Sequence, residues 1–194
     1  GLSTTMFAVL DAVVNPEVAY RDPGTLFTIN WWFGRRNPMK PPELYRYFRD
    51  QTRSFEAVVP VAWDQVTMDV AGEQWDFRVR RVTPSWFTLT GIAPRLGRGL
   101  VASDGEDAVV LSWDLWKRIF GQRRGLDGAA VTLGGRPVPV VGVLPRGTGN
   151  GGAWMALPAN IESTVITSAT VRPLVRLRAG VTRDEADREI KTLA

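Results

Sequence analysis

Acidic side chains are the residues of this sequence that could carry chemistry, because the chain contains no His and no Cys. That composition excludes Ser–His–Asp triads, Cys–His pairs, thiolate nucleophiles and the usual zinc ligand sets. Sites built on carboxylate pairs, Lys or Mg²⁺ remain open. We expect a chain that is not an enzyme and has no cofactor or metal, and the acidic clusters are where that expectation can fail.

One acidic cluster lies in a short polar segment around Gly105. Asp104, Glu106 and Asp107 have the density of charge that a cation site would need. Their spacing does not complete a calcium-binding loop. Adjacent acids beside a glycine are also typical of an ordinary solvated turn, and we predict a turn here.

Three further acids lie on a predicted β-hairpin. Asp64, Asp69 and Asp76 would offer a carboxylate pair if two of them converged in a pocket, as a carboxylate-dependent hydrolase would require. Alternating strands place polar residues on their solvent face without any chemistry. We interpret these acids as residues of that polar face.

A glycine-rich run, Gly147–Gly152, invites comparison with a phosphate-binding loop. No G-K-[ST] sequence follows it, and the residues Trp154–Pro158 after it favour a short strand over the start of a helix. We therefore expect a mobile surface loop at this position.

One group of aromatic and basic residues is a candidate partner surface: Trp31, Trp32, Phe33, Arg35 and Arg36. Because side chains alternate across a strand, one of the two adjacent tryptophans must face away from the core. Exposed aromatic residues beside arginine have the composition of protein interfaces. Packing between two lobes is the alternative explanation for the same residues.

The elements that would position these residues alternate irregularly between strands and short helices, which is typical of the α+β class. A strand, a helix and a strand over 26–63 predict a βαβ unit. The final helix begins with a capping box formed by Thr182 and Glu185. The further elements that we expect are helices over 3–14, 84–90 and 113–120, hairpins over 66–82 and 130–144, and strands over 109–111, 154–158 and 171–178.

A long, ordered set of short motifs carries a resemblance to a known family. The motifs are Asp11–Val13, Arg53–Glu56, Trp86-Phe87 with Leu89 and Gly91, Pro94 with Leu96–Arg98, Val109–Ser112, Leu115-Trp116 with Arg118, Phe120 and Gly121, Val140–Pro145, and Arg176–Thr182. The chain resembles the MacB-like periplasmic core domain of FtsX-type ABC transporter permeases. It is most similar to the branch of duplicated, often orphan permeases.

The resemblance implies a two-lobed fold of the MacB type. Residues 15–63 and 164–194 would form a discontinuous, membrane-proximal βαβ lobe, and 64–163 would be an inserted, membrane-distal lobe made mainly of strands. Residues 1–14 would be the periplasmic end of a transmembrane helix. In the family a strand follows the last helix, so we expect an unfilled sheet position or an exposed edge near the C-terminus.

The resemblance also implies a function. The domain would be non-catalytic and periplasmic, on a permease of the bacterial inner membrane, and would couple helix motion to partner or substrate engagement in export or mechanotransmission. Its partners would be the cytoplasmic ATPase of the same transporter, reached through the membrane helices, and an adaptor or envelope protein in the periplasm.

Composition limits the other possibilities. A formal net charge of +4 predicts a modestly basic surface, and no motif points to nucleic acid. No segment reaches the roughly 18 apolar residues of a membrane span, and the abrupt start in a helical pattern suggests a segment of a longer permease. The alternative is a secreted saccharide- or peptide-binding module that uses the Trp-rich strands. We expect Trp75, Trp86, Trp113 and Trp116 at core positions, which favours a scaffold.

Overall fold

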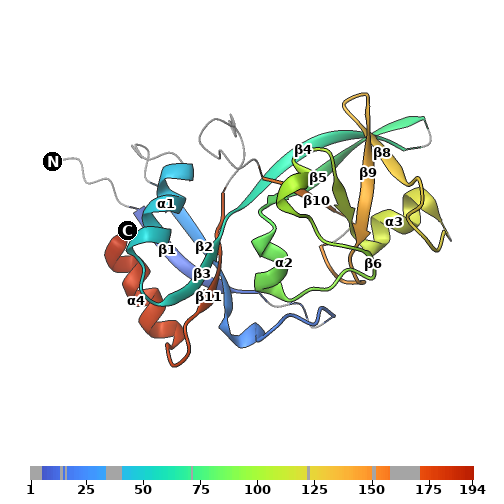
Figure 1. Ribbon diagram of the computed structural model, residues 1–194. Coiled ribbons are helices and arrows are strands. Elements are labelled where there is room, and N and C mark those ends of the chain that lie inside the picture. Colours follow the sequence, from blue (N-terminus) through green and yellow to red (C-terminus); the bar gives the residue numbers. More distant parts are fainter. Residues whose placement is uncertain are drawn as a thin grey trace. The chain divides into compact units, whose positions relative to one another are not determined.

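The computed structural model describes residues 6–13, 15, 17–33, 41–70, 72–121, 123–149, 152–157 and 171–194 (Figure 1). It confirms the α+β class. The chain divides into two compact units, of which unit 1 comprises Gly1–Val14, Asp22–Val61 and Thr170–Ala194, and unit 2 comprises Asn15–Arg21 and Ala62–Ala169. In the described part of the chain, no helix has both the length and the apolar character needed to cross a membrane.

Unit 1 contains a four-stranded antiparallel sheet. Its strands follow the order β1 (Met6–Ala12), β2 (Leu26–Phe33), β11 (Leu174–Leu177) and β3 (Phe55–Val59). Because β2 and β3 both run antiparallel to the strand between them, they are parallel to each other. The helix α1 (Pro41–Gln51) connects them, so the predicted strand–helix–strand unit is present and spans β11.

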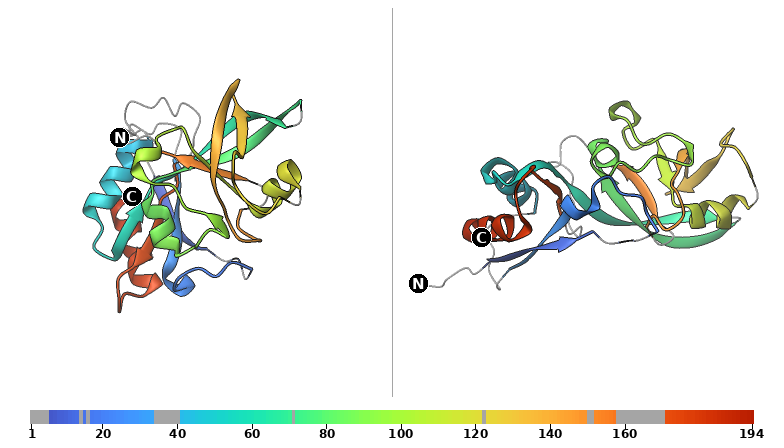
Figure 2. Two further views of the ribbon diagram at one scale, coloured as in Figure 1. Left: turned by 45° about the vertical axis from the view of Figure 1, so that its right-hand side comes forward. Right: turned by 90° about the horizontal axis from the view of Figure 1, so that it is seen from below.

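Two helices cover this sheet in unit 1 (Figure 2). The helix α1 contributes Phe48, which is fully buried and stacks on Trp31 of β2 with ring centroids 5.7 Å apart. The helix α4 (Arg183–Leu193) buries Ile190. The predicted capping box at its start is confirmed, since the Thr182 hydroxyl accepts a hydrogen bond from the Glu185 backbone N–H and the Glu185 carboxylate accepts one from the Thr182 N–H.

The first element of unit 1 differs from the sequence-based expectation. Residues Met6–Ala12 form the strand β1 and not part of a helix, and they pair with β2 along their whole length. Ala8 and Leu10 are buried, whereas Asp11 is exposed, so the burial alternates with the period of a strand. The apolar spacing fits either element, and pairing with β2 decides between them.

The strand β1 also fills the sheet position that we expected to be empty. In a split βαβ arrangement, a strand following the second helix would pair beside the first strand of the sheet. In unit 1 that position beside β2 is taken by β1.

Unit 2 is built on a closed ring of strands. The strand order is β6-β9-β7-β10-β5-β4-β8, and β8 also pairs with β9, which closes the ring and leaves β6 attached outside it. The strands are β4 (Val61–Val70), β5 (Glu73–Val82), β6 (Leu96–Gly97), β7 (Val109–Leu111), β8 (Ala130–Leu133), β9 (Arg136–Val143) and β10 (Ala153–Ala156). The two predicted hairpins are therefore present as β4–β5 and β8–β9.

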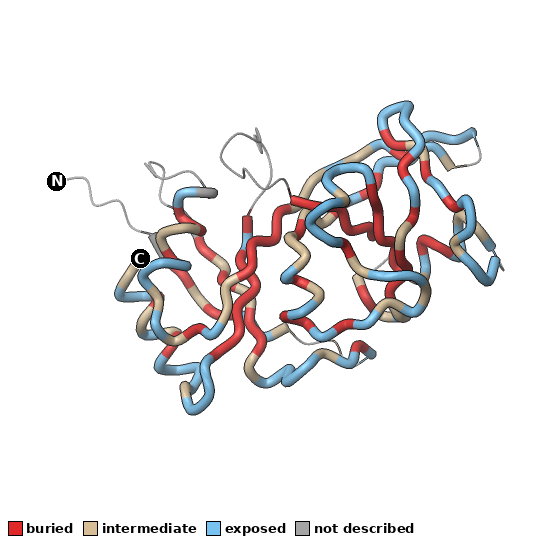
Figure 3. Tube along the Cα trace, in the orientation of Figure 1, coloured by how far each residue is buried: buried red, intermediate tan, exposed pale blue. Residues whose placement is uncertain are grey.

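The core of unit 2 lies among these strands and one helix (Figure 3). The helix α3 (Trp113–Phe120) inserts Leu115 and Trp116 between apolar residues of the strands. Ser112 caps it by accepting a hydrogen bond from the Leu115 N–H, as predicted. The shorter helix α2 (Ser85–Thr90) ends at Gly91, whose φ of 71° is the left-handed conformation expected there. Two 3₁₀ turns complete the elements: η1 (Pro23–Thr25) in unit 1 and η2 (Ala102–Asp104) in unit 2.

Two glycines allow β6 to approach β9 closely. A Cβ atom at Gly142 would lie 2.0 Å from the backbone oxygen of Arg98, and one at Gly97 would lie 2.2 Å from the backbone oxygen of Val141. Gly97 also has a φ of 65°. Only glycine fits at this contact without movement of the backbone.

Candidate functional site

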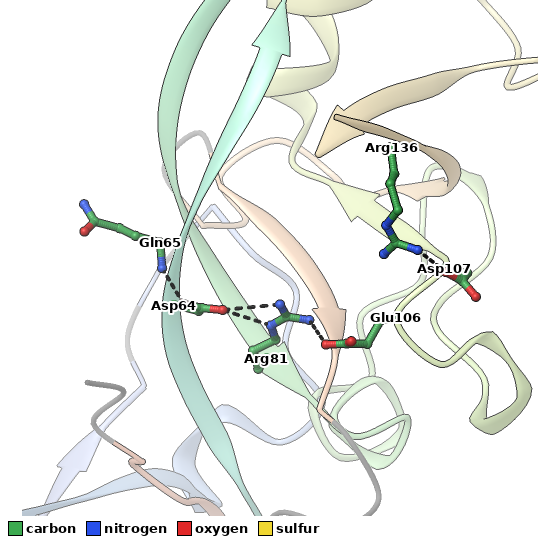
Figure 4. A network of polar contacts seen from close by, with 6 residues as sticks. All are labelled: Asp64, Gln65, Arg81, Glu106, Asp107 and Arg136. Atoms are coloured by element: carbon green, nitrogen blue, oxygen red, sulfur yellow. Dashed lines mark hydrogen bonds and ion pairs between the residues drawn. The ribbon is translucent and has the colours of Figure 1, made fainter. Parts of the chain in front are cut away.

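Two acids of the insertion converge on one arginine (Figure 4). Arg81 Nε and Nη2 each lie 3.3 Å from Asp64 Oδ2, and Arg81 Nη1 lies 3.2 Å from Glu106 Oε1. Asp64 also accepts a hydrogen bond from the Gln65 backbone N–H. Asp64 and Glu106 are thus ion-pair partners of Arg81.

The other acids of the predicted polar turn pair with different arginines. Asp104 accepts hydrogen bonds from both Nη atoms of Arg98 at 2.7 Å and from the Val101 N–H at 2.8 Å. Asp107 lies 3.5 Å from Arg136, and both of these side chains are well exposed (Figure 4). The acids of this segment thus point to separate partners. No group of three or more possible metal ligands occurs among the described residues.

The remaining acids of the first hairpin have structural contacts. Asp69 accepts a hydrogen bond from the Gly72 N–H in the turn, and Asp76 accepts one from the Thr67 hydroxyl on the neighbouring strand. These are the contacts of turn and polar-face residues, as the sequence predicts. They give no support to the carboxylate-dependent hydrolase.

Of the five residues of the predicted partner surface, the structure describes the side chain of Trp31 alone. Trp31 is only 7% exposed and packs on Phe48 in the core of unit 1, so of the two adjacent tryptophans it is the one that faces the core. Trp32 and Phe33 end β2, where their backbones pair with β1. The side chains of these two residues, together with Arg35 and Arg36, lie outside the described part of the structure.

The other tryptophans argue against a flat saccharide-binding platform. Trp86 and Trp116 are buried as predicted, and Trp113 is half-buried. The core position expected for Trp75 is wrong, since its side chain is 39% exposed and stacks on Phe77. It is the one exposed tryptophan among those whose burial is described. A platform of several coplanar exposed rings is not formed by these residues.

A site that the sequence did not single out lies on β4, β5 and β10 of unit 2. We call it the arginine–tryptophan cluster and define it as Trp63, Arg78, Arg80 and Trp154. The guanidinium carbons of Arg78 and Arg80 each lie 4.3 Å from the centre of the Trp63 ring, and that of Arg80 lies 5.0 Å from the Trp154 ring. These distances are within the range of cation–π contacts.

The electrostatics of the cluster are unusual at Arg80. Burial lowers the pKa of Arg80 to about 10, the nearby Tyr20 opposes this shift, and the charge of Arg78 adds to it. Burial also raises the pKa of Tyr20, so this phenol is neutral at neutral pH and supplies no counter-charge. Arg80 remains a cation at neutral pH, with a like charge as its charged neighbour.

A glycine of the Gly-rich run lies directly against the cluster. A Cβ at Gly149 would lie 2.4 Å from Arg80 Nη1 and 2.5 Å from Trp154 Cη2. The preceding Thr148 is only 3% exposed. The expectation of a surface loop is therefore wrong for Thr148, because this residue is buried. Asn150 and Gly151 lie outside the described residues.

One sequence signal could have located part of the cluster. Arg78 and Arg80 alternate with the buried Phe77 and Val79, so strand periodicity alone places the two arginines on one face of β5. The sequence does not show that Trp154 approaches the same face, because the parallel pairing of β10 with β5 joins distant segments.

Three solved structures share the fold of this chain. The periplasmic region of MacB from Actinobacillus actinomycetemcomitans matches with a TM-score of 0.59 and 19% identity, over 74% of this chain and 68% of that one. The extracellular domain of the noncanonic ABC-type transporter YknZ from Gram-positive bacteria matches with a TM-score of 0.56 and 21% identity, over 81% and 80%. A domain of a putative permease protein from Porphyromonas gingivalis matches with a TM-score of 0.54 and 14% identity, over 77% of this chain and 68% of that one.

The family follows from the sequence match. The model of the MacB-like periplasmic core domain matches residues 1–193, so the chain belongs to this family of ABC transporter permease domains. No curated protein matches the chain. The resemblance stated from the sequence motifs is thereby confirmed, and the fold of the solved relatives agrees with it.

Proposed function

We propose that this chain is a non-catalytic extracytoplasmic domain of an inner-membrane ABC permease, and that it transmits movement of the membrane helices to a partner or substrate. Membership of the MacB-like family supports the permease context. The acids of the insertion whose contacts are described serve ion pairs, turns and strand faces, which supports a mechanical role over a catalytic one.

The observation that carries the proposal is the way unit 1 joins both ends of the chain. The Asp187 carboxylate of α4 accepts a hydrogen bond from the Leu10 N–H of β1, and Arg183 donates one to the Leu10 carbonyl at 2.7 Å. Glu189 of the same helix accepts from the backbone N–H groups of Arg53 and Ser54 before β3. A displacement of either end is therefore passed to one hydrogen-bonded sheet.

The partners in this proposal follow from the same role. Helices in the inner membrane would connect unit 1 to a cytoplasmic ATPase. Unit 2 is inserted between Val61 and Thr170 of unit 1 in chain order, so it would carry the movement outward. An adaptor or envelope protein in the periplasm would receive it.

A spin-label experiment on the full permease in membranes tests this role. The chain has no native Cys, so labels attach only at introduced ones. One label replaces the exposed Arg188 on α4 of unit 1, and the other replaces the exposed Lys117 on α3 of unit 2. We expect the distance distribution between them to change when a hydrolysis-deficient ATPase binds ATP.

The control is a pair of labels within unit 1, at Arg188 and the exposed Glu56 of β3. This distance should stay the same in both nucleotide states, because both labels lie on one unit. An unchanged distance between Arg188 and Lys117 would refute the transmission of movement. ATP hydrolysis by the purified chain alone would refute the non-catalytic assignment.

A further inference from the structure

Arg80 is a half-buried cation without a compensating anion. Among the described residues, no carboxylate pairs with it and none accepts a hydrogen bond from its guanidinium. Its neighbours are two indole rings, a neutral phenol and the second cation Arg78. By contrast, Arg81 next to it in sequence contacts two carboxylates. A buried charge without a partner is costly, so Arg80 requires an explanation beyond packing.

Two further polar atoms lack partners, one on Trp154 of the cluster and one on Thr148, the residue before Gly149. The indole Nε1 of Trp154 and the hydroxyl of Thr148 are both buried, and neither has a hydrogen-bond partner. Trp154 is 1% exposed and Thr148 is 3% exposed. An indole N–H and a guanidinium can only donate, and a hydroxyl can donate as well. Arg80 and Trp154 therefore offer unused donors, and no described residue supplies a counter-charge to them.

The contacts with the two rings leave the hydrogen-bonding capacity of the Arg80 guanidinium unused among the described residues. A guanidinium can stack on an indole face and still present the N–H groups at its edge to a ligand. That edge matches the two oxygens of a carboxylate in a bidentate pair. Gly149 and Gly152 keep room at Nη1, because a Cβ at either position would lie 2.4 Å or 3.4 Å from it.

We propose that the arginine–tryptophan cluster of unit 2 is a recognition site for a carboxylate, held by the edge of Arg80 with Arg78 beside it and with the apolar stem of the ligand against Trp63. The carboxylate would come from an acidic residue of a partner polypeptide or from a small free acid. The exposed Arg78 keeps one side of the cluster open to solvent. This site goes beyond the coupling role proposed above and does not depend on it.

Solution NMR of the 194-residue chain tests the proposal. The Nε–Hε signal of Arg80 is followed while succinate, or a capped tetraglutamate peptide, is added at constant ionic strength. We expect a saturable shift of this signal with at least one probe. Saturation with both probes assigns the site to small acids as well, and saturation with the peptide alone assigns it to an acidic partner segment.

Two variants separate recognition from general charge effects. Arg80→Met should abolish the ligand-induced rise in Tm that the wild-type chain shows with the same probe, and it should raise Tm without ligand because an uncompensated cation is removed. Arg118→Met is the matched control, since Arg118 also lies over a tryptophan, Trp75, at 5.2 Å in the same unit. This control should keep the full ligand-induced rise.

Two results would overturn the proposal. One is a linear, non-saturating shift of the Arg80 signal with both probes, which is the behaviour of a weak salt effect. The other is a lower Tm for Arg80→Met without ligand together with no ligand effect on the wild-type chain. That combination would show that Arg80 only stabilises the packing of Trp63 and Trp154.

Discussion

One neighbouring arginine, Arg98, is the main cause of the lowered pKa of Asp104. The Arg98 hydrogen bonds lower the pKa of Asp104 below its ordinary value; burial opposes this shift and the Val101 N–H adds to it. The Asp104 side chain is 8% exposed, whereas Arg98 is 49% exposed. A carboxylate with three donors is strongly held in its charged form.

Asp104→Asn should therefore destabilise the chain at pH 7 by about 1–2 kcal/mol. Because the folded-state pKa of Asp104 is lower than its unfolded value of 3.8, its stabilisation is complete above the unfolded pKa and is lost as the pH falls through the folded pKa. The difference between variant and wild type should thus shrink as the pH falls well below 3.8. Urea unfolding at pH 7 and at low pH measures it.

Asp107→Asn is the control for this prediction. Asp107 and Arg136 are 80% and 67% exposed, and such surface pairs contribute little. Its effect at pH 7 should stay below about 0.5 kcal/mol. An equal loss for both variants, or a loss from Asp104→Asn that persists at low pH, would contradict the assigned role of the Arg98 pair.

The role of a residue was predictable from the sequence only where it depends on residues a few positions away in the chain. Ser112 as a helix cap and Thr182 with Glu185 as a capping box depend on spacings of three residues, and both are present. The contacts of Arg80 with Trp63 and Trp154 depend on strand pairings that no local pattern reveals. The burial of Trp31 depends on Phe48 of a different element.

Among the elements, the contact of β6 with β9 has the least tolerance for added atoms. Gly142→Ala would place a methyl group 2.0 Å from the Arg98 carbonyl oxygen, within backbone and not against a flexible side chain. We expect a loss of about 1–3 kcal/mol in the free energy of unfolding, as for overpacked interiors. Chemical denaturation measures it.

Gly125→Ala is the matched substitution. Its Cβ would meet only the Asp127 carboxylate, at 3.9 Å, and Gly125 is not among the glycines with positive φ. It should leave stability unchanged or raise it slightly. If Gly142→Ala were equally harmless, the close approach of the two strands would not exist in solution.

Element types were largely predictable, whereas their pairing was not. The turn at Gly134-Gly135 correctly predicts the β8–β9 hairpin, because two-residue turns join neighbours in sequence. The strand β1 was predicted as helix, since its apolar residues fit both periods and only β2 resolves the choice. The closure of the ring by β9 depends on its pairing with both β8 and β7, which no single hairpin pattern encodes.

At the scale of the whole molecule, each unit has its own buried centre, and stability should be distributed accordingly. Phe48→Ala removes a fully buried ring from unit 1, at a cost of about 3–5 kcal/mol. We expect hydrogen exchange to accelerate mainly at the backbone amides of β2 and α1. The amides of β7 and β9 should keep most of their protection.

Trp116→Ala is the reciprocal variant, because Trp116 is fully buried in the core of unit 2. It should accelerate exchange in the strands of unit 2 and spare β2. Equal acceleration in both units for both variants would show that the chain opens as one cooperative body, contrary to this prediction.

The central position of β11 in the unit 1 sheet also sets the order in which the polypeptide acquires structure during synthesis. The strands β2 and β3 leave the ribosome early, but β11 lies between them and follows the whole of unit 2 in the chain. At about 5–20 residues per second, they wait several seconds or more for it. In that interval unit 2 can close its ring, while the unpaired edges of β2 and β3 are targets for chaperones and for wrong pairing.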